Sequence, residues 1–166
     1  MTHDNHTTAG LLKTSVTTRA ESCLYHACRL SLVAVFLVSG LTKMLHPSDF
    51  ASIIEAYGLI PDPLVFPAAI SLIAVEIVAA AGLLFEKDGA LLLITLQLLL
   101  FIAVLIFGIH LGLDIDCGCF GPNDPEAEAF HDLRGALMRD FLLLLAVGYQ
   151  YFWRHINNFK PKPLFD

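Results

Sequence analysis

Four long hydrophobic runs constrain the fold of this sequence more than any other feature. They cover about residues 24–45, 64–85, 90–111 and 135–153. Each run approaches the roughly 20 residues that an α-helix needs to cross a bilayer. Because lipid offers no hydrogen-bond partner, every backbone group in such a run must bond within its own helix. We therefore predict an all-α polytopic membrane protein, a bundle of four transmembrane helices.

The composition and the polar ends agree with a membrane protein. Hydrophobic residues make up 56% of the chain and charged residues only 16%, whereas soluble domains have roughly a quarter of their residues charged. The net charge of −6 argues against a nucleic-acid partner. Residues 1–22 lack the apolar core of a cleaved signal peptide, and we expect a polar tail, disordered or interfacial. The membrane domain should then span residues 23–154, and a second tail residues 155–166.

A short amphipathic segment separates the first two runs. Its apolar residues recur at helical spacing between Pro47 and Pro61, and they are Phe50, Ile53, Ile54 and Tyr57. This pattern predicts a short helix that lies along the membrane surface. A second interpretation is that this helix forms a lid, with Tyr57 as a lid residue. The lid would cover the site that the cysteine-containing 114–132 loop serves.

The distribution of basic residues predicts the orientation of the bundle. With four spans, the two tails and the 86–88 turn share one face, and the 114–132 loop lies on the other. Seven basic residues lie on the first face and three on the second: Lys13, Arg19, Arg29, Lys87, Arg154, Lys160 and Lys162 against Lys43, Arg134 and Arg139. Basic residues favour the cytoplasmic side. We therefore expect both termini in the cytoplasm and a 114–132 loop that faces the periplasm or the cell exterior.

Two cysteines in that loop are the main candidates for chemistry. Cys117 and Cys119 are separated only by Gly118, so their Cα atoms can be at most about 6.6–7.2 Å apart, near the limit for a disulfide. A bend at the glycine would bring them closer. The pair could exchange electrons as a strained disulfide or brace the loop as a static one. It could also bind a metal with His110 or His131, although the spacing fits no common zinc pattern.

Cys23 and Cys28 form a second pair at the start of the first run. Their spacing of five puts them about 140° apart around a helix, so they do not share a face. They also lie on the predicted reducing side, opposite the loop cysteines. We interpret them as inert thiols.

Ionisable residues inside the hydrophobic runs are functional candidates, because charges are costly in lipid. Glu76 lies in the middle of the second run, Arg29 and Lys43 near the two ends of the first, and Arg139 with Asp140 early in the fourth. Together they predict a polar membrane interior. Glu76 could form an ion pair that fixes helix packing, hold a proton, or line a cavity for a substrate or a quinone. No motif supports the quinone.

Three glycines within the runs predict close approach of helices. They are Gly40, Gly82 and Gly108.

Several of these stretches together resemble the MauE branch of the DoxX-like membrane proteins. The resemblance covers about residues 27–148, and its most specific part is Cys117-Gly-Cys-Phe-Gly121 with Arg29, Gly40 and Lys43 in the first run. It implies a four-helix inner-membrane protein that acts beside a periplasmic thioredoxin-like partner. It also implies a disulfide-rich client, the type case being the small subunit of methylamine dehydrogenase. Asparagine follows the matching arginine in some members, where this chain has Asp140.

Three hypotheses of function follow. The first is a membrane component of a periplasmic thiol–disulfide system, in which Cys117 and Cys119 exchange electrons with a thioredoxin-like protein. A quinone is a candidate cofactor in this hypothesis. The second is a transporter or exporter subunit that uses Glu76 while the cysteines only brace a loop. The third is a scaffold that assembles neighbouring redox proteins and depends on packing glycines such as Gly40.

Overall fold

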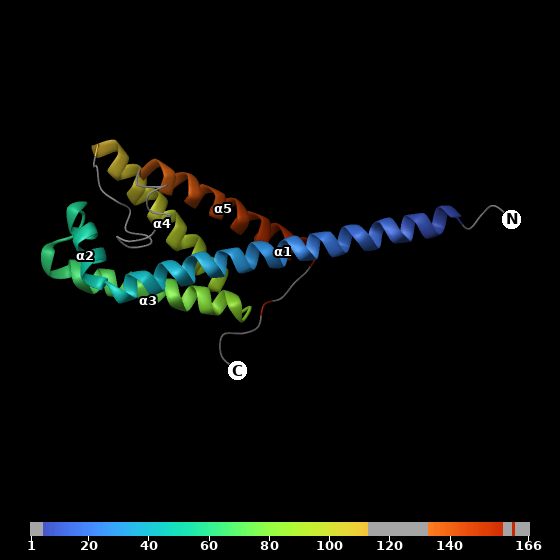
Figure 1. The fold of residues 1–166 in the computed structure, drawn as a ribbon, viewed down its shortest axis with the longest axis horizontal. Helices are drawn as coiled ribbons and strands as arrows, with labels where there is room; N and C mark the ends of the chain where they lie inside the picture. The colour runs from blue at the N-terminus through green and yellow to red at the C-terminus, as the bar shows by residue number, and fades with distance from the viewer. Residues whose placement is uncertain (1–4, 113–132, 158–160, 162–166) are drawn as a thin grey trace.

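The all-α fold predicted from the sequence is confirmed by the structure, a computed structural model. It describes residues 5–112, 133–157 and 161, with side chains from residue 21 onward. These residues form five helices (Figure 1): α1 (Asn5–Leu45), α2 (Pro47–Ala56), α3 (Asp62–Leu84), α4 (Ala90–Leu111) and α5 (Leu133–Ile156).

Three of the described helices are long and apolar enough to cross a membrane. The apolar stretches are Glu21–Leu45 of α1, Asp62–Leu84 of α3 and Ala90–Leu111 of α4, within three residues of the predicted runs. Helix α5 has the length for a span, at 24 residues, but Arg139 and Asp140 reduce its hydropathy. The fold therefore supports a membrane protein with at least these three spanning helices.

Helix α1 begins earlier than the sequence led us to expect. We expected residues 1–22 to be disordered or interfacial, whereas α1 extends back to Asn5 and runs for 41 residues. This stretch contains no proline, the residue that most strongly interrupts a helix. Figure 1 shows the N-terminal half of α1 projecting beyond the other helices.

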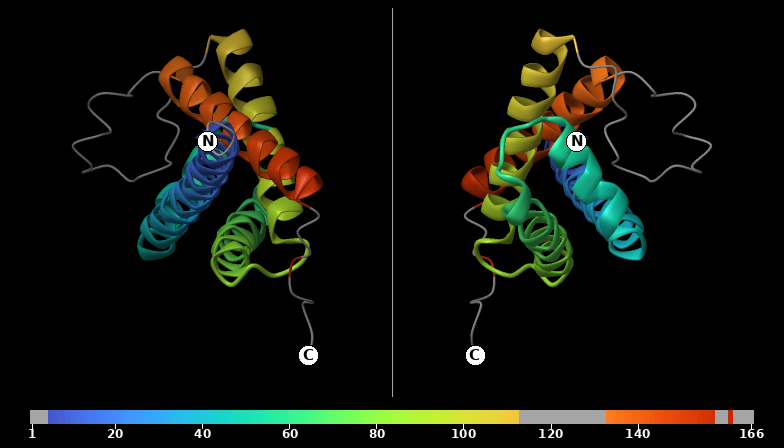
Figure 2. Two further views of the ribbon diagram at one scale, coloured as in Figure 1. Left: turned by 90° about the vertical axis from the view of Figure 1, so that its right-hand side faces the viewer. Right: turned by 90° about the vertical axis from the view of Figure 1, so that its left-hand side faces the viewer.

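The four long helices pack in a closed ring. Helix α1 contacts α3 and α5, α3 contacts α4, and α4 contacts α5, while α2 packs on α3 and touches α1. Successive long helices run in opposite directions, and α4 and α5 are inclined to α1 and α3 (Figure 2). The bundle therefore has two ends. One holds α2 and both attachment points of the 113–132 segment (the α2 end), and the other holds the connection between α3 and α4 (the turn end).

The predicted helix between the first two runs is present as α2. Pro47 occupies its first turn, where the missing N–H is not needed. Phe50 and Ala51 are buried against Ala69 and Ile73 of α3, so the apolar face of α2 packs on the bundle. The location of its outer face along a membrane surface stays a prediction.

The three glycines predicted to allow close packing each lie at a tight contact. A Cβ atom on Gly40 would stand 2.8 Å from Ile77 Cγ1, and one on Gly82 would stand 2.9 Å from Ala90 Cβ. A Cβ atom on Gly108 would meet the Tyr57 ring at 2.7 Å. All three distances are shorter than van der Waals contact. The contacts of α1 with α3, of α3 with α4, and of α4 with Tyr57 are therefore this close only because the three positions lack a side chain.

Replacing Gly40 tests this packing. Gly40→Val should destabilise the α1–α3 contact by about 1–3 kcal/mol, because the added atoms overlap Ile77. Gly148→Val is the control, since nothing lies within 4 Å of a Cβ at Gly148 and a change of less than about 0.5 kcal/mol is expected there. Thermal unfolding in detergent, followed by circular dichroism, measures both. Equal shifts in the two variants would contradict the close approach.

Candidate functional site

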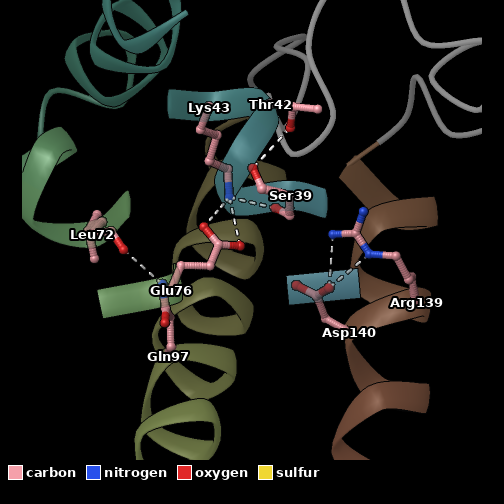
Figure 3. Close-up of polar contacts among 8 residues, drawn as sticks. All are labelled: Ser39, Thr42, Lys43, Leu72, Glu76, Gln97, Arg139 and Asp140. Carbon is pink, nitrogen blue, oxygen red and sulfur yellow. Dashed lines mark hydrogen bonds and ion pairs between the residues drawn. The ribbon is translucent and has the colours of Figure 1, made fainter. Parts of the chain in front are cut away.

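A buried ion pair joins α1 to α3 near the α2 end. The Lys43 ammonium donates hydrogen bonds to Glu76 Oε2 at 2.9 Å and to Oε1 at 3.2 Å, as Figure 3 shows. It also donates to Ser39 Oγ at 2.9 Å. Both charged side chains are almost fully buried, with 2% and 3% of their surface exposed. An ion pair with a basic residue was one of the roles that the sequence suggested for Glu76, and the structure identifies Lys43 as the partner.

Two aromatic rings complete the surroundings of Lys43. Its ammonium lies 5.0 Å from the centre of the Phe50 ring on α2 and 4.9 Å from that of Phe101 on α4. Both distances fall within the range of cation–π attraction. A single charged group therefore contacts residues of α1, α2, α3 and α4.

A second charged pair is supplied by α5. Arg139 donates to Asp140 Oδ1 through Nε at 3.0 Å and Nη2 at 2.9 Å. Asp140 is only 2% exposed, and its Oδ2 atom has no hydrogen-bond partner among the described residues. Asp140 and Arg139 line a small cavity together with Glu76 and Ser39, so the two charged pairs face each other across the bundle (Figure 3).

Gln97 is a buried polar residue that the sequence analysis missed. It lies on α4 with 4% of its surface exposed, and its Nε2 donates to the Leu72 carbonyl at 3.2 Å. Leu72 is one helical turn before Glu76, so this bond fixes α4 beside the ion pair. The signal was an amide in the middle of an otherwise apolar run, which a search for charged residues does not detect.

A larger cavity of about 300 Å³ adjoins the charged residues beneath α2. Its wall is almost entirely apolar, formed by α2 and the residues that follow it on one side and by α4 on the other. The exceptions include Lys43, Asp140 and Tyr57. Tyr57, the predicted lid residue, is 8% exposed and packs against Gly108. The segment that was predicted as a possible lid therefore covers a cavity.

Arg29 does not join this cluster, although the sequence analysis grouped it with the polar interior. It pairs with Glu86 in the turn between α3 and α4, at the turn end. Glu86 adopts a positive φ of 55°, which is uncommon for a residue other than glycine. The predicted polar interior is therefore two separate sites, with Lys43, Glu76, Arg139 and Asp140 in one and Arg29 in the other.

The cysteines are only partly described. Cys23 is exposed and Cys28 is half-buried, and both are free thiols. Cys117 and Cys119, the predicted redox pair, lie outside the described residues, as does His131. Within the described ranges, no group of three or more histidine, cysteine or acidic side chains is arranged to hold a metal.

The buried pair predicts an asymmetric response to substitution. Lys43→Met leaves the Glu76 carboxylate buried without its partner and should cost about 3–5 kcal/mol. Adding Glu76→Leu removes the stranded charge, and the double variant should recover most of that loss. Chemical unfolding in mixed micelles measures the single and double variants. If their effects simply add, Lys43 and Glu76 are not coupled.

Comparison with known proteins identifies the family. The family model described as methylamine utilisation protein MauE matches residues 21–152. The methylamine utilization protein MauE of Paracoccus denitrificans is 31% identical over 127 residues, which cover 74% of this chain and 68% of that protein. No solved structure matches significantly. The matched region contains all of α2, α3 and α4 and both buried charged pairs, and the chain belongs to the MauE family.

Proposed function

We propose that this chain is an inner-membrane component of a periplasmic thiol–disulfide maturation system. Cys117 and Cys119 would exchange a disulfide with a soluble thioredoxin-like protein, which in turn serves a disulfide-rich client. One observation carries the proposal. The segment that holds both cysteines leaves α4 at Leu111 and rejoins the bundle at Leu133, at the α2 end (Figure 1). The buried Lys43–Glu76 pair and the cavity beneath α2 lie toward the same end.

Family membership supports an accessory role in methylamine utilisation. The Paracoccus denitrificans relative is named for that process, and the client here would be an enzyme subunit of it. The loop disulfide would be the oxidant. A partner thiolate attacks one loop sulfur, a mixed disulfide forms, and the second partner thiol resolves it. The partner leaves oxidised, and the loop keeps two electrons and two protons as a dithiol.

The proposed topology has four spans, with α5 as the fourth. The two charged residues in its apolar stretch 135–153 are Arg139 and Asp140, and they neutralise each other. Asp140 faces the bundle interior, which is where charged residues in a spanning helix are tolerated. Four apolar residues of this stretch, Met138, Phe141, Leu142 and Leu145, are exposed in the described bundle and would contact lipid.

The structure favours the redox function over the transporter function. A transporter that uses Glu76 needs a carboxylate with room to bind or release its substrate ion. Both oxygens of Glu76 accept hydrogen bonds from Lys43, so the carboxylate is already neutralised. Glu76 is better suited to stabilising the bundle than to binding a passing cation.

The redox potential of the loop tests the proposed function. In the purified chain, the Cys117–Cys119 pair should titrate within the range of thioredoxin-like couples, very roughly −120 to −270 mV. Thiol trapping across a graded glutathione series measures the potential. Cys23→Ser/Cys28→Ser is the control and should leave it unchanged. A disulfide that resists reduction below about −300 mV would instead be a structural brace.

Thiol labelling tests the topology. A variant that keeps only Cys23, which is exposed, should react with a membrane-impermeant maleimide in inverted vesicles but not in spheroplasts. A variant that keeps only Cys119 should show the opposite pattern. The reason is that an odd number of spans separates the two cysteines if α1, α3 and α4 all cross the membrane. Labelling of both from the same side would contradict the arrangement.

A further inference from the structure

The cavity beneath α2 has an apolar entrance. Leu59, after α2, and Leu100, on α4, both line it and are 49% and 46% exposed. In a bilayer such exposed leucines lie against acyl chains, so a molecule would enter from lipid rather than from water. The volume of about 300 Å³ is at the small end for ligand pockets. This volume suits a lipid-soluble molecule whose single ring and first tail atoms lie in the cavity, while the rest of its hydrocarbon tail stays in the membrane.

The charges at the inner end of the cavity are already balanced. Lys43 is paired with Glu76 and Asp140 with Arg139. A charged ligand would add an uncompensated charge in a region of low polarity, which is strongly unfavourable. The cavity therefore selects an uncharged occupant.

The hydrogen-bonding groups at the inner end are nearly all used, with one exception. An ammonium has three donors, and Lys43 directs them to Ser39 and to the two oxygens of Glu76. Asp140 Oδ2 is a buried acceptor without a partner among the described residues, on a side chain that is 3% exposed. Since such an atom is costly to leave unpaired, the favoured occupant brings a hydrogen-bond donor.

We propose that this cavity binds the ring of a lipid-soluble quinol, with a ring hydroxyl donating to Asp140 Oδ2. The phenyl rings of Phe50 and Phe101 in the cavity wall supply aromatic surface for the quinol ring. The choice of a quinol among uncharged hydroxyl compounds rests on the proposed function. Reoxidation of the loop dithiol breaks two S–H bonds and forms one S–S bond. A quinone that accepts the two electrons and two protons becomes the uncharged quinol.

Binding to a redox-inactive chain tests this site separately from the proposed function. The full-length Cys117→Ser/Cys119→Ser variant in nanodiscs is titrated anaerobically with a ubiquinol analogue that has one isoprene unit, by calorimetry. Leu100→Trp, which narrows the entrance, should weaken binding at least tenfold. Leu99→Trp is the matched control, because Leu99 is 47% exposed on the same helix but does not line the cavity. It should bind within twofold of the parent chain.

Equal losses in the two tryptophan variants, or no binding to the parent chain, would overturn the proposal. Because the loop cysteines are absent, neither result depends on whether they are redox-active. Conversely, a loop disulfide that resists reduction below about −300 mV would rule out the proposed function without affecting the measured quinol binding.

Asp140→Asn tests the role assigned to the carboxylate. The parent chain should bind the quinol more tightly than the corresponding quinone, because only the quinol donates to Oδ2. An amide can also donate to a quinone carbonyl, so Asp140→Asn should reduce the quinol preference at least fivefold. Gel filtration and circular dichroism report whether this variant is folded. If a folded variant keeps the preference for quinol over quinone, Asp140 does not bind the quinol.

Discussion

The cost of placing charge inside a membrane is the constraint on which this structure depends. Lipid surrounds the helices with a medium as apolar as their own side chains, so burial of hydrophobic surface does little to hold them together. The Lys43–Glu76 pair provides contacts that lipid cannot replace. Its ammonium lies where α1, α2, α3 and α4 meet, and either charge alone would be strongly unfavourable there. The closed ring of helices shields both.

Much of the fold could be predicted because membrane helices have a simple sequence pattern. The apolar runs identified the apolar stretches of α1, α3 and α4 to within three residues, and Gly40, Gly82 and Gly108 marked the close contacts. The beginning of α1 could not be predicted in the same way. Its first residues are polar, and a polar sequence without a breaker is compatible with either a helix or a tail.

The candidate site was predicted residue by residue but not as an arrangement. The sequence singled out Lys43, Glu76 and Asp140 as costly residues, yet the choice of partners depends on how the helices are rotated and shifted relative to one another. Arg29 pairs with Glu86, which lies in a connection that no hydropathy pattern emphasises. The cavity was also beyond prediction, because it is the space left between α2 with the residues that follow it and α4, and no sequence motif encodes it.

The contact between Phe50 and Lys43 has a consequence for how α2 relates to the membrane interior. Phe50 belongs to the cover of the cavity, and its ring lies 5.0 Å from an ammonium that is bound to Glu76. Any event that displaces α2 changes the stability of the ion pair. By thermodynamic reciprocity, any event that perturbs the ion pair changes the stability of the docked position of α2 by the same coupling free energy. A protein that docks on the outer face of α2 would thus change the affinity of the bundle for a molecule bound inside it, and the reverse, without any contact between the two.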